Sequence, residues 1–342
     1  MNIKFYQVFL VIYTILNIAT FVLYGIDKKR AREEKWRIPE AVLLKSAFYG
    51  GAFGAGIGML FFHHKTRKKE FQVKVPLFIC LHIFLIIFCT WSNNHLVVTK
   101  YDLGKDSGVA GDFRIVQVSD LHNTYLWWQK GYVADMVAEQ KPDMIVITGD
   151  MIDSRTTDKK TAIDTAKRLT SIADTYYVTG NHEERFSDEY LEEFFAELKE
   201  AGVRVLEDEY ILVGEGDEEF ALIGIRDKSL ERMELPLKEL IREAQKEAGS
   251  DIPTVVLSHE PQLIKTYAEA DADLVLTGHA HGGQIRLPII GGLVAPDQGL
   301  FPKYTSGLYT SGNTKMIVSR GVGNSAAPIR VFNDPEIVVV DL

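Results

Sequence analysis

Three apolar stretches dominate the first hundred residues of the chain. Residues 5–26 and 75–99 carry no charged side chain, and residues 41–62 carry a single one. About 20 consecutive apolar residues are enough for a helix to cross the hydrocarbon core of a bilayer. A signal peptide fits the first stretch poorly, because it runs into a charged segment without a small-residue cleavage site. The pattern predicts a helical membrane module over residues 1–95, with two to three transmembrane segments at about 5–26, 41–62 and 75–95.

Two basic loops flank the second apolar stretch and bear on its course. Residues 28–37 contain six basic side chains and residues 63–74 contain five. If all three stretches span, these loops lie on opposite sides and the positive-inside rule gives almost no preference. A re-entrant second stretch would instead place both loops in the cytoplasm and the rest of the chain outside, and we favour this alternative. The glycines Gly50, Gly54 and Gly58 of this stretch have the spacing of close helix packing.

From residue 112 onward the pattern changes to short β-rich runs separated by helix-period stretches. The predicted strands cover residues 113–119, 143–149, 175–180, 210–214, 219–225, 254–258, 273–278, 315–319 and 335–341, and the predicted helices cover 127–140, 159–172, 188–200 and 231–248. Alternating strands and helices are typical of an α/β core with parallel strands, whereas strands without intervening helices favour a mixed part. We therefore predict one α/β domain over residues 112–342, joined to the membrane module by a linker over residues 96–111.

Charge divides the chain at the same place as the hydrophobic pattern. Residues 1–100 contain 14 basic and 5 acidic side chains, a net charge of +9. Residues 101–342 contain the other 24 of 38 basic and 42 of 47 acidic side chains, a net charge of −18 that argues against a nucleic-acid partner. Two cysteines exclude a disulfide scaffold and a cysteine-rich zinc module. Any metal site must therefore use histidine and carboxylate ligands.

Five of the predicted strands end in side chains that can bind metals. The motifs are Ser119-Asp120-Leu121-His122, Thr148-Gly149-Asp150, Gly180-Asn181-His182-Glu183, Ser258-His259-Glu260 and Gly278-His279-Ala280-His281-Gly282-Gly283. All five histidines of residues 101–342 fall in these motifs. In open α/β folds, ligands gather at the carboxyl ends of the strands. The ordered set therefore predicts a metal site at that edge.

The chemistry that needs such a set is hydrolysis of a phosphate ester with two metal ions. Two divalent ions about 3.5–4 Å apart clamp the attacking and leaving oxygens and make hydroxide from bound water near neutral pH. The ligands available for them are Asp120, His122, Asp150, Asn181, His259, His279 and His281. Histidine nitrogens mixed with carboxylates favour Mn, Fe, Co, Ni or Zn over Mg or Ca.

The ordered motifs D-x-H, G-D, G-N-H-E, H-E and G-H-A-H-G-G-Q resemble the calcineurin-like metallophosphoesterase superfamily over about residues 112–342. Pro296 near residues 301–304, together with residues 319–321 and 328–330, resembles its membrane-associated bacterial branch. The resemblance implies a β-sandwich of mixed sheets flanked by helices. It also implies that the chain is an enzyme, a metal-dependent phosphoesterase.

The same resemblance implies roles for the site residues. One metal ion would be held by Asp120, His122, Asp150 and His281. Asp150 would bridge to a second ion, which Asn181, His259 and His279 would complete. His182 would not be a ligand but would stabilise or protonate the leaving oxygen, a general-acid role that suits histidine.

The first hundred residues carry a second resemblance, to a small bacterial membrane-domain family of unknown function. It rests on Tyr24-Gly25-Ile26-Asp27-Lys28, Trp36-Arg37-Ile38-Pro39-Glu40 and His64-Lys65-Thr66-Arg67-Lys68, and it covers about residues 5–92. This resemblance supplies no chemistry.

Four carboxylates outside the ligand set also need an interpretation. Glu183 and Glu260 directly follow residues of the ligand set, and either orient these ligands or are solvated. We expect Asp153 and Asp227 to be turn or cap residues.

The leading hypothesis is a multi-pass protein of the cell membrane whose catalytic domain lies outside the cytoplasm. It would hydrolyse phosphomonoester, phosphodiester or pyrophosphate bonds by attack of metal-bound hydroxide. Its partners would be the lipid bilayer and a phosphorylated small molecule or lipid, such as a cell-envelope precursor. Arg286 and Arg330 are candidates for bidentate contacts to the substrate phosphate, against the alternative of surface salt bridges. The alternative function is a catalytically silent membrane sensor or scaffold that binds metal or phosphate.

Overall fold

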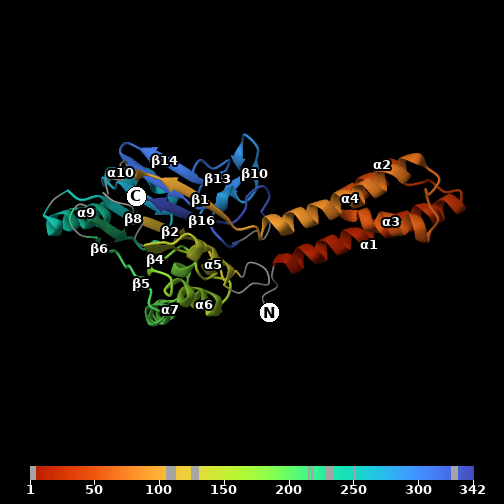
Figure 1. Cartoon of the computed structure of the whole chain (residues 1–342). Helices are drawn as coiled ribbons and strands as arrows, with labels where there is room; N and C mark the ends of the chain where they lie inside the picture. The colour runs from red at the N-terminus through yellow and green to blue at the C-terminus, as the bar shows by residue number, and fades with distance from the viewer. Residues whose placement is uncertain are drawn as a thin grey trace. The chain divides into compact units, whose positions relative to one another are not determined.

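The chain forms two compact units, Met1–Trp91 and Ser92–Leu342, which are drawn in Figure 1 and described here one at a time. The computed structural model describes residues 5–104, 113–124, 131–214, 216, 219–227, 234–249, 251–324 and 330–342.

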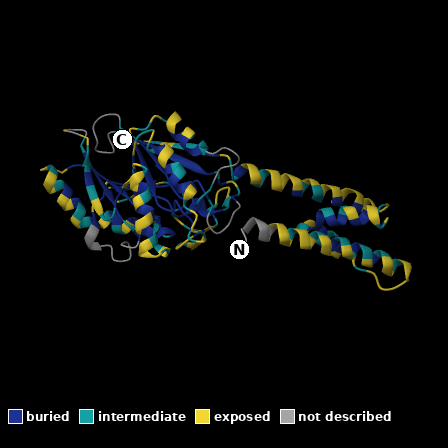
Figure 2. Cartoon of the chain, turned by 90° about the horizontal axis from the view of Figure 1, so that it is seen from below, coloured by how far each residue is buried: buried dark blue, intermediate teal, exposed yellow. Residues whose placement is uncertain are grey.

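Two long helices frame the first unit. Helix α1 covers Phe5–Arg32 and helix α4 covers Lys69–Ser92. Their segments Leu10–Arg32 and Lys69–Ser92 have mean hydropathies of 1.7 and 2.3 and are long and apolar enough to cross a membrane. Most of their side chains are exposed (Figure 2), as expected of helices that face lipid.

The segment between these helices is a re-entrant pair of short helices. Helix α2 covers Glu40–Ser46 and helix α3 covers Ala52–Phe61, with a turn at Ala47–Gly51 between them. The break lies at Tyr49 and Gly50, and Gly50 has a φ of 123° that favours glycine. Both ends of the pair return to the same end of the unit, because Glu40, the first residue of α2, accepts a hydrogen bond from Lys65 after α3 at 2.7 Å. This hairpin has the shape that the re-entrant course requires, and its course through a membrane stays a prediction.

Polar side chains of the long helices satisfy the backbone groups that the break leaves free. The Asn17 side chain donates to the carbonyl of Gly50 and accepts from the amide of Gly54, both at 2.8 Å. His82 Nε2 lies 3.0 Å from the carbonyl oxygen of Phe48. Unpaired backbone groups are costly in an apolar environment, so irregular backbone persists there only with such partners. A Cβ on Gly54 would lie 1.9 Å from the carbonyl oxygen of Asn17, which explains the glycine.

The three motifs of the N-terminal resemblance meet in one buried ionic network. The carboxylate of Asp27, at the first motif, is fully buried. It lies 2.7 Å from Arg37 Nη2 of the second motif and 2.7 Å from His64 Nε2 of the third. The amide of Ile38 also donates to Asp27, at 2.9 Å. The network ties the end of α1 to both ends of the re-entrant pair.

The second unit contains two mixed six-stranded sheets. The first has the order β1 (Val97–Asp102), β16 (Glu336–Asp341), β2 (Arg114–Val118), β3 (Met144–Thr148), β4 (Asp174–Val178) and β5 (Arg204–Val205). The second has the order β14 (Gly307–Ser311), β15 (Thr314–Val318), β9 (Leu274–Thr277), β8 (Thr254–Leu257), β7 (Phe220–Gly224) and β6 (Glu209–Val213). Strands β2 to β5 are parallel, as are β7, β8, β9 and β15, while β16–β2, β6–β7 and β14–β15 pair antiparallel.

Helices cover the outer face of each sheet, and the inner faces pack on one another. Helices α5 (Tyr132–Glu139), α6 (Lys160–Leu169) and α7 (Asp188–Glu200) pack on the first sheet. Helices α9 (Glu234–Ala248) and α10 (Ile264–Glu269) pack on the second. The core between the sheets includes Ile115, Val146, Leu222, Leu257 and Leu276. This arrangement confirms the predicted sandwich of mixed sheets flanked by helices.

Two parts of the second unit differ from the sequence prediction. Residues 97–102 were predicted as linker, but they form β1, which pairs in parallel with β16 from Val97↔Glu336 onward. The partner strand lies at the far end of the chain, so no local pattern announces this pairing. Two unpredicted hairpins follow β9, namely β10–β11 (Arg286–Leu287, Gly291–Gly292) and β12–β13 (Val294–Ala295, Gly299–Leu300). Predicted helix residues 127–130 and 231–233 and the linker residues 105–111 lie outside the described residues.

Replacing Asn17 by leucine tests the role of the buried amide at the helix break. Asn17→Leu leaves the Gly50 carbonyl and the Gly54 amide without a partner, at a cost of about 1–3 kcal/mol each. We expect the Tm of the full chain in detergent, followed by circular dichroism, to fall by at least about 4 °C. The matched control is Thr14→Leu, an exposed position on the same helix. Equal Tm values for the two variants would contradict this role.

Candidate metal centre

All seven predicted ligands lie just beyond the carboxyl ends of parallel strands. Asp120 and His122 follow β2, Asp150 follows β3, and Asn181 follows β4, all in the first sheet. In the second sheet, His259 follows β8, and His279 and His281 follow β9. The carboxyl ends of both parallel sets meet at one edge of the sandwich, as a site at such an edge requires.

Glycines allow the two sheets to approach closely at this edge. A Cβ on Gly278 would lie 1.9 Å from Ser119 Oγ, and a Cβ on Gly149 would lie 2.5 Å from His259 Nδ1. The sheets are also joined by a hydrogen bond of 2.8 Å between His259 Nδ1 and the carbonyl oxygen of Thr148. Because no side chain fits between the strand ends, the ligands from the two sheets come into direct contact.

Five of the ligands occupy the left-handed backbone region. The φ angles are 53° at Asp120, 46° at His122, 53° at Asp150, 64° at His279 and 46° at His281. This region is sparsely populated by residues other than glycine, and it costs about 1–2 kcal/mol for each residue. Strain of this kind gathers at functional sites, where the surrounding structure holds each side chain in a required direction.

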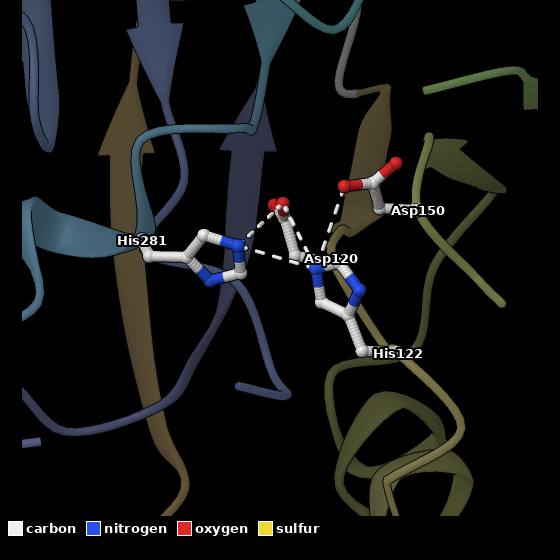
Figure 3. A group of neighbouring side chains, drawn as sticks. All are labelled: Asp120, His122, Asp150 and His281. Atoms are coloured by element: carbon white, nitrogen blue, oxygen red, sulfur yellow. Dashed lines mark hydrogen bonds and ion pairs between the residues drawn. The ribbon is translucent and has the colours of Figure 1, made fainter. Parts of the chain in front are cut away.

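Asp120, His122, Asp150 and His281 form a first buried donor group (Figure 3). His122 Nε2 lies 3.4 Å from Asp150 Oδ2, and His281 Nε2 lies 3.4 Å from Asp120 Oδ1. The two imidazole Nε2 atoms are 3.2 Å apart. One donor atom from each of the four residues lies within 4.8 Å of all the others, which is the spacing of ligands around a shared cation.

A second donor group shares Asp150 with the first. It contains Asp150, His259 and His279, all buried. His259 Nε2 lies 3.3 Å from Asp150 Oδ2 and has no hydrogen-bond partner. A terminal atom of the Asn181 carboxamide lies 3.2 Å from Asp150 Oδ2 and 3.1 Å from His279 Nδ1. An amide oxygen at this place would complete a ring of electron-pair donors, and Asp150 is placed to bridge the two groups.

The electrostatics of the histidines suit a metal cation. Burial lowers the pKa of His122 and of His281 to about 3, so both imidazoles are neutral at physiological pH and present lone pairs. Burial also opposes protonation of His259, but the carboxylates of Asp150 and Asp120 outweigh it and raise the His259 pKa. The raised pKa of His259 shows that the carboxylates favour a positive charge at this place, and a divalent ion would supply it. The buried imidazole and carboxylate donors therefore fit divalent transition-metal ions.

His182 lies beside the first donor group, with its ring centroid 4.6 Å from that of His122. The amide of Ser154 donates to His182 Nδ1 at 3.1 Å, so the neutral ring carries its proton on Nε2. Asp153 Oδ1 lies 3.4 Å from the same Nδ1. Burial raises the Asp153 pKa, but hydrogen bonds with His182 and Arg155 outweigh this effect and hold it below its ordinary value. Asp153 is a turn residue, as predicted, since its Oδ1 accepts from the amide of Arg155 at 3.0 Å, and its carboxylate also lies beside His182.

Glu183 orients the loops that carry the ligands, one of the two alternatives left open by the sequence. Its side chain is fully buried, and its Oε2 accepts from the amides of Asp150 at 2.8 Å and Gly180 at 2.9 Å. Its Oε1 accepts from the amide of Ile152 at 3.0 Å. Burial and the nearby Asp150 carboxylate raise the pKa of Glu183 to about 8. Glu260 is only half-buried.

Asp227, expected in a turn or cap, is another buried carboxyl group near the centre. Its residue is only 9% exposed, and burial raises its pKa to about 7. Its electrostatic neighbours include His259, Glu260 and Asp150. The sequence pattern around Asp227 contains no ligand motif, which is why its burial was missed.

The two predicted substrate arginines have protein partners. Arg286 donates to the carbonyl of Gly282 at 2.9 Å and to Thr305 Oγ1 at 3.1 Å. Arg330 is fully buried and donates to the carbonyl of Arg320 and to Asn324 Oδ1, both at 2.9 Å. These bonds fix the loops behind His281, and contact with a substrate phosphate stays a prediction for both arginines.

Asp297 is a site residue that the sequence did not identify. It lies in the turn between β12 and β13, and its Oδ2 is 2.8 Å from His279 Nε2. Because Nδ1 of the same ring lies 3.1 Å from the Asn181 carboxamide, the Asp297 carboxylate contacts the imidazole on its opposite nitrogen. A carboxylate on the far nitrogen of a ligating histidine fixes the ring and strengthens it as a donor.

Removing the charge of Asp297 tests this support of His279. Asp297→Asn should weaken binding of one Mn²⁺ ion to the metal-free full chain about 10–100-fold, since supporting partners of ligating histidines have effects of this size. Isothermal titration calorimetry measures the change. The control is Asp174→Asn, which changes an exposed carboxylate at the opposite end of β4 and should leave the affinities for both Mn²⁺ ions unaltered. Wild-type affinity in Asp297→Asn would show that the contact does not matter.

Comparison with known proteins agrees with this geometry. Residues 17–71 match a family described as a protein of unknown function, DUF1294, and residues 113–283 match the calcineurin-like phosphoesterase family. The chain is 28% identical over 237 residues to phosphodiesterase YaeI of Escherichia coli, covering 68% of this chain and 83% of that protein.

Two further relatives extend the match. An uncharacterized metallophosphoesterase of Bacillus subtilis, YkuE, is 31% identical over 265 residues, covering 75% of this chain and 88% of that protein. A bovine transmembrane protein with metallophosphoesterase domain is 31% identical over 298 residues, covering 83% of this chain and 64% of that protein. With the donor groups in place, these matches show that the chain belongs to the calcineurin-like phosphoesterase family and is a metal-dependent phosphoesterase.

Proposed function

We propose that this chain is a membrane-tethered phosphoesterase with two divalent transition-metal ions (Mn, Fe, Zn, Co or Ni) in its active site. One ion would be held by Asp120, His122, Asp150 and His281, and the other by Asp150, Asn181, His259 and His279. The observation that carries the proposal is the pair of buried donor groups that share Asp150. The substrate class is a phosphomonoester, phosphodiester or pyrophosphate of a lipid-linked or cell-envelope molecule.

The side chains of the site divide the catalytic work. When bound, two divalent ions would polarise the phosphoryl oxygens and activate the attacking water near neutral pH. The neutral ring of His182 presents an Nε2–H, because Nδ1 accepts the Ser154 amide, and this N–H would stabilise the charge of the leaving oxygen through a hydrogen bond. To protonate that oxygen as a general acid, His182 must be an imidazolium, with its second proton on Nδ1 beside Asp153 Oδ1, and it returns to the neutral ring when the Nε2 proton is transferred. Asp153 stabilises the positive charge that His182 bears whenever it is protonated. Glu183 holds the loop of Asp150 in place through three backbone amides.

A catalytically silent sensor or scaffold is the alternative function. It would keep the metal ligands without needing an oriented acid beside them. The fixed tautomer of His182 and its carboxylate partner Asp153 favour catalysis, because neither is required for binding alone.

The membrane tether rests on α1 and α4, and on the bovine relative named as a transmembrane protein. In a re-entrant arrangement only these two helices span, and the basic loops 28–37 and 63–74 lie at the same end. The positive-inside rule then assigns that end to the cytoplasm. The carboxyl end of α4, and with it the catalytic unit, would lie on the outside.

Hydrolysis of bis(p-nitrophenyl) phosphate by the purified full chain with Mn²⁺ tests the catalytic proposal. His182→Ala should lower kcat about 10²–10⁴-fold, the usual contribution of a general acid. Asp150→Ala should abolish turnover because it removes the shared ligand, and a chelator should do the same reversibly. Asp174→Asn should retain wild-type activity. Unchanged rates in His182→Ala and Asp150→Ala would refute the assignment, and a metal-loaded but inactive wild type would favour the silent scaffold.

Reporter fusions test the proposed orientation. Alkaline phosphatase, active only outside the cytoplasm, should be active when fused after Leu342, and a green fluorescent protein at the same place should be dark. Fusions after Glu34, in the first basic loop, should give the reverse pattern. A fluorescent fusion at Leu342 would place the catalytic unit inside the cell and overturn the orientation.

A further inference from the structure

The exposed apolar side chains of the second unit are concentrated in one segment. Among its described residues, every large hydrophobic side chain that is well exposed lies between residues 287 and 332. They are Leu287 (37% exposed), Ile289 (107%), Ile290 (59%), Val294 (44%), Leu300 (76%), Phe301 (67%), Leu308 (43%) and Phe332 (59%). Single exposed apolar residues need no explanation, but a concentration of this kind marks an interaction surface.

Most of these residues lie in or next to the two hairpins that follow His281. We use the name apolar rim for five of them, Leu287, Ile289, Ile290, Leu300 and Phe301. Ile289 and Ile290 lie in the turn of β10–β11, and Leu300 and Phe301 lie at the end of β12–β13. An exposed turn with consecutive isoleucines gains nothing for the fold of the unit itself, because those side chains are not buried in it.

The apolar rim is rigidly connected to the metal centre. A Cβ on Gly283, directly after His281, would lie 2.4 Å from the Cα of Gly292 in the first hairpin. Asp297, in the turn of the second hairpin, contacts His279 at 2.8 Å. The same hairpin therefore holds a metal ligand at its turn and carries exposed Leu300 and Phe301 on its returning strand and just beyond it.

Charge favours an anionic surface as the partner of this segment. Residues 284–308 contain the basic Arg286 and Lys303 and one acidic residue, Asp297, whose carboxylate is engaged with His279. This segment has a net charge of +1, so the rest of residues 101–342 carries a net charge of −19. Lys303 is exposed, and its Nζ lies 4.9 Å above the ring of Tyr304. Apolar tips beside an aromatic ring and a lysine are typical of segments at the level of lipid headgroups.

We propose that the apolar rim inserts into the headgroup region of the bilayer and that the enzyme takes a phosphorylated lipid directly from it. This inference deepens the proposed function by naming a membrane lipid as the substrate class. Insertion of Ile289, Ile290 and Phe301 places the edge with His279 and His281 at the membrane surface, where the phosphate of a lipid headgroup lies. In this arrangement the hairpin tips take the role that the apolar face of an amphipathic helix has at a membrane surface.

Fluorescence of the rim measures insertion without relying on catalysis. Ile289→Cys and Phe301→Cys are made in the full chain with Cys80→Ser and Cys89→Ser, labelled with the polarity-sensitive dye NBD, and reconstituted in nanodiscs of phosphatidylcholine and phosphatidylglycerol. We expect blue-shifted emission that spin-labelled lipids quench. Lys246→Cys, an exposed position on α9, is the control and should report water.

The outcomes of the fluorescence experiment separate the possible occupants. Emission at residues 289 and 301 equal to that at residue 246 overturns the proposal. A blue shift that spin-labelled lipids do not quench also overturns it, because a protein partner or a second copy then covers the rim. Neither result depends on whether the chain is an active phosphoesterase.

Kinetics test the substrate class. The triple variant Ile289→Ser/Ile290→Ser/Phe301→Ser should hydrolyse soluble bis(p-nitrophenyl) phosphate within about twofold of the wild-type rate. For phosphatidyl-p-nitrophenol in vesicles, which has the same leaving group, its KM should rise at least about tenfold with kcat unaltered. An equal loss on both substrates, or no change on the lipid, contradicts the proposal. A wild type inactive on both would instead sink the proposed function, while the fluorescence result would still stand.

Discussion

The second unit depends on one constraint, a cluster of buried electron-pair donors at the shared edge of its two sheets. His122 and His281 face one another at 3.2 Å with Asp120 and Asp150 beside them. Burying two carboxylates among neutral imidazoles without a compensating positive charge is costly. Divalent cations would supply that charge, and metal binding would then stabilise this edge.

The rest of the unit serves this edge. Glycines before the ligands let the sheets converge, and left-handed backbone at five ligands turns the side chains inward. Glu183 binds three amides of the ligand loops, and Asp297 holds His279 from the far side. These supporting groups account for how strained loops at the strand ends keep one geometry.

The sequence placed the candidate ligands at one edge because each follows a recognisable strand and the motifs are local, and their role as metal ligands stays a prediction. Asp120, Asp150 and His281 could be placed from the order of strands alone. The pairing of β1 with β16 could not, because it joins residues more than two hundred positions apart with no local signal. The contacts of Asp297 with His279 and of Asp153 with His182 were missed for a similar reason. Each acts on a histidine from another loop, and a carboxylate in a turn has the same sequence pattern whether it is solvated or supports a ligand. The helix hairpin of residues 40–61 could not be predicted locally either, because its break is held by Asn17 and His82, which lie on the two long helices.

The number of metal ions per chain is the most direct test of the account. Loss of Asp150 would affect both proposed metal sites, whereas loss of His259 would affect only one. The purified full chain, loaded with Mn²⁺ and dialysed, is analysed by inductively coupled plasma mass spectrometry with His259→Ala and Asp150→Ala beside it. The account predicts two ions in the wild type, one in His259→Ala, and fewer in Asp150→Ala than in His259→Ala. A wild type that retains at most one ion, or an Asp150→Ala variant that retains as many as the wild type, would contradict it.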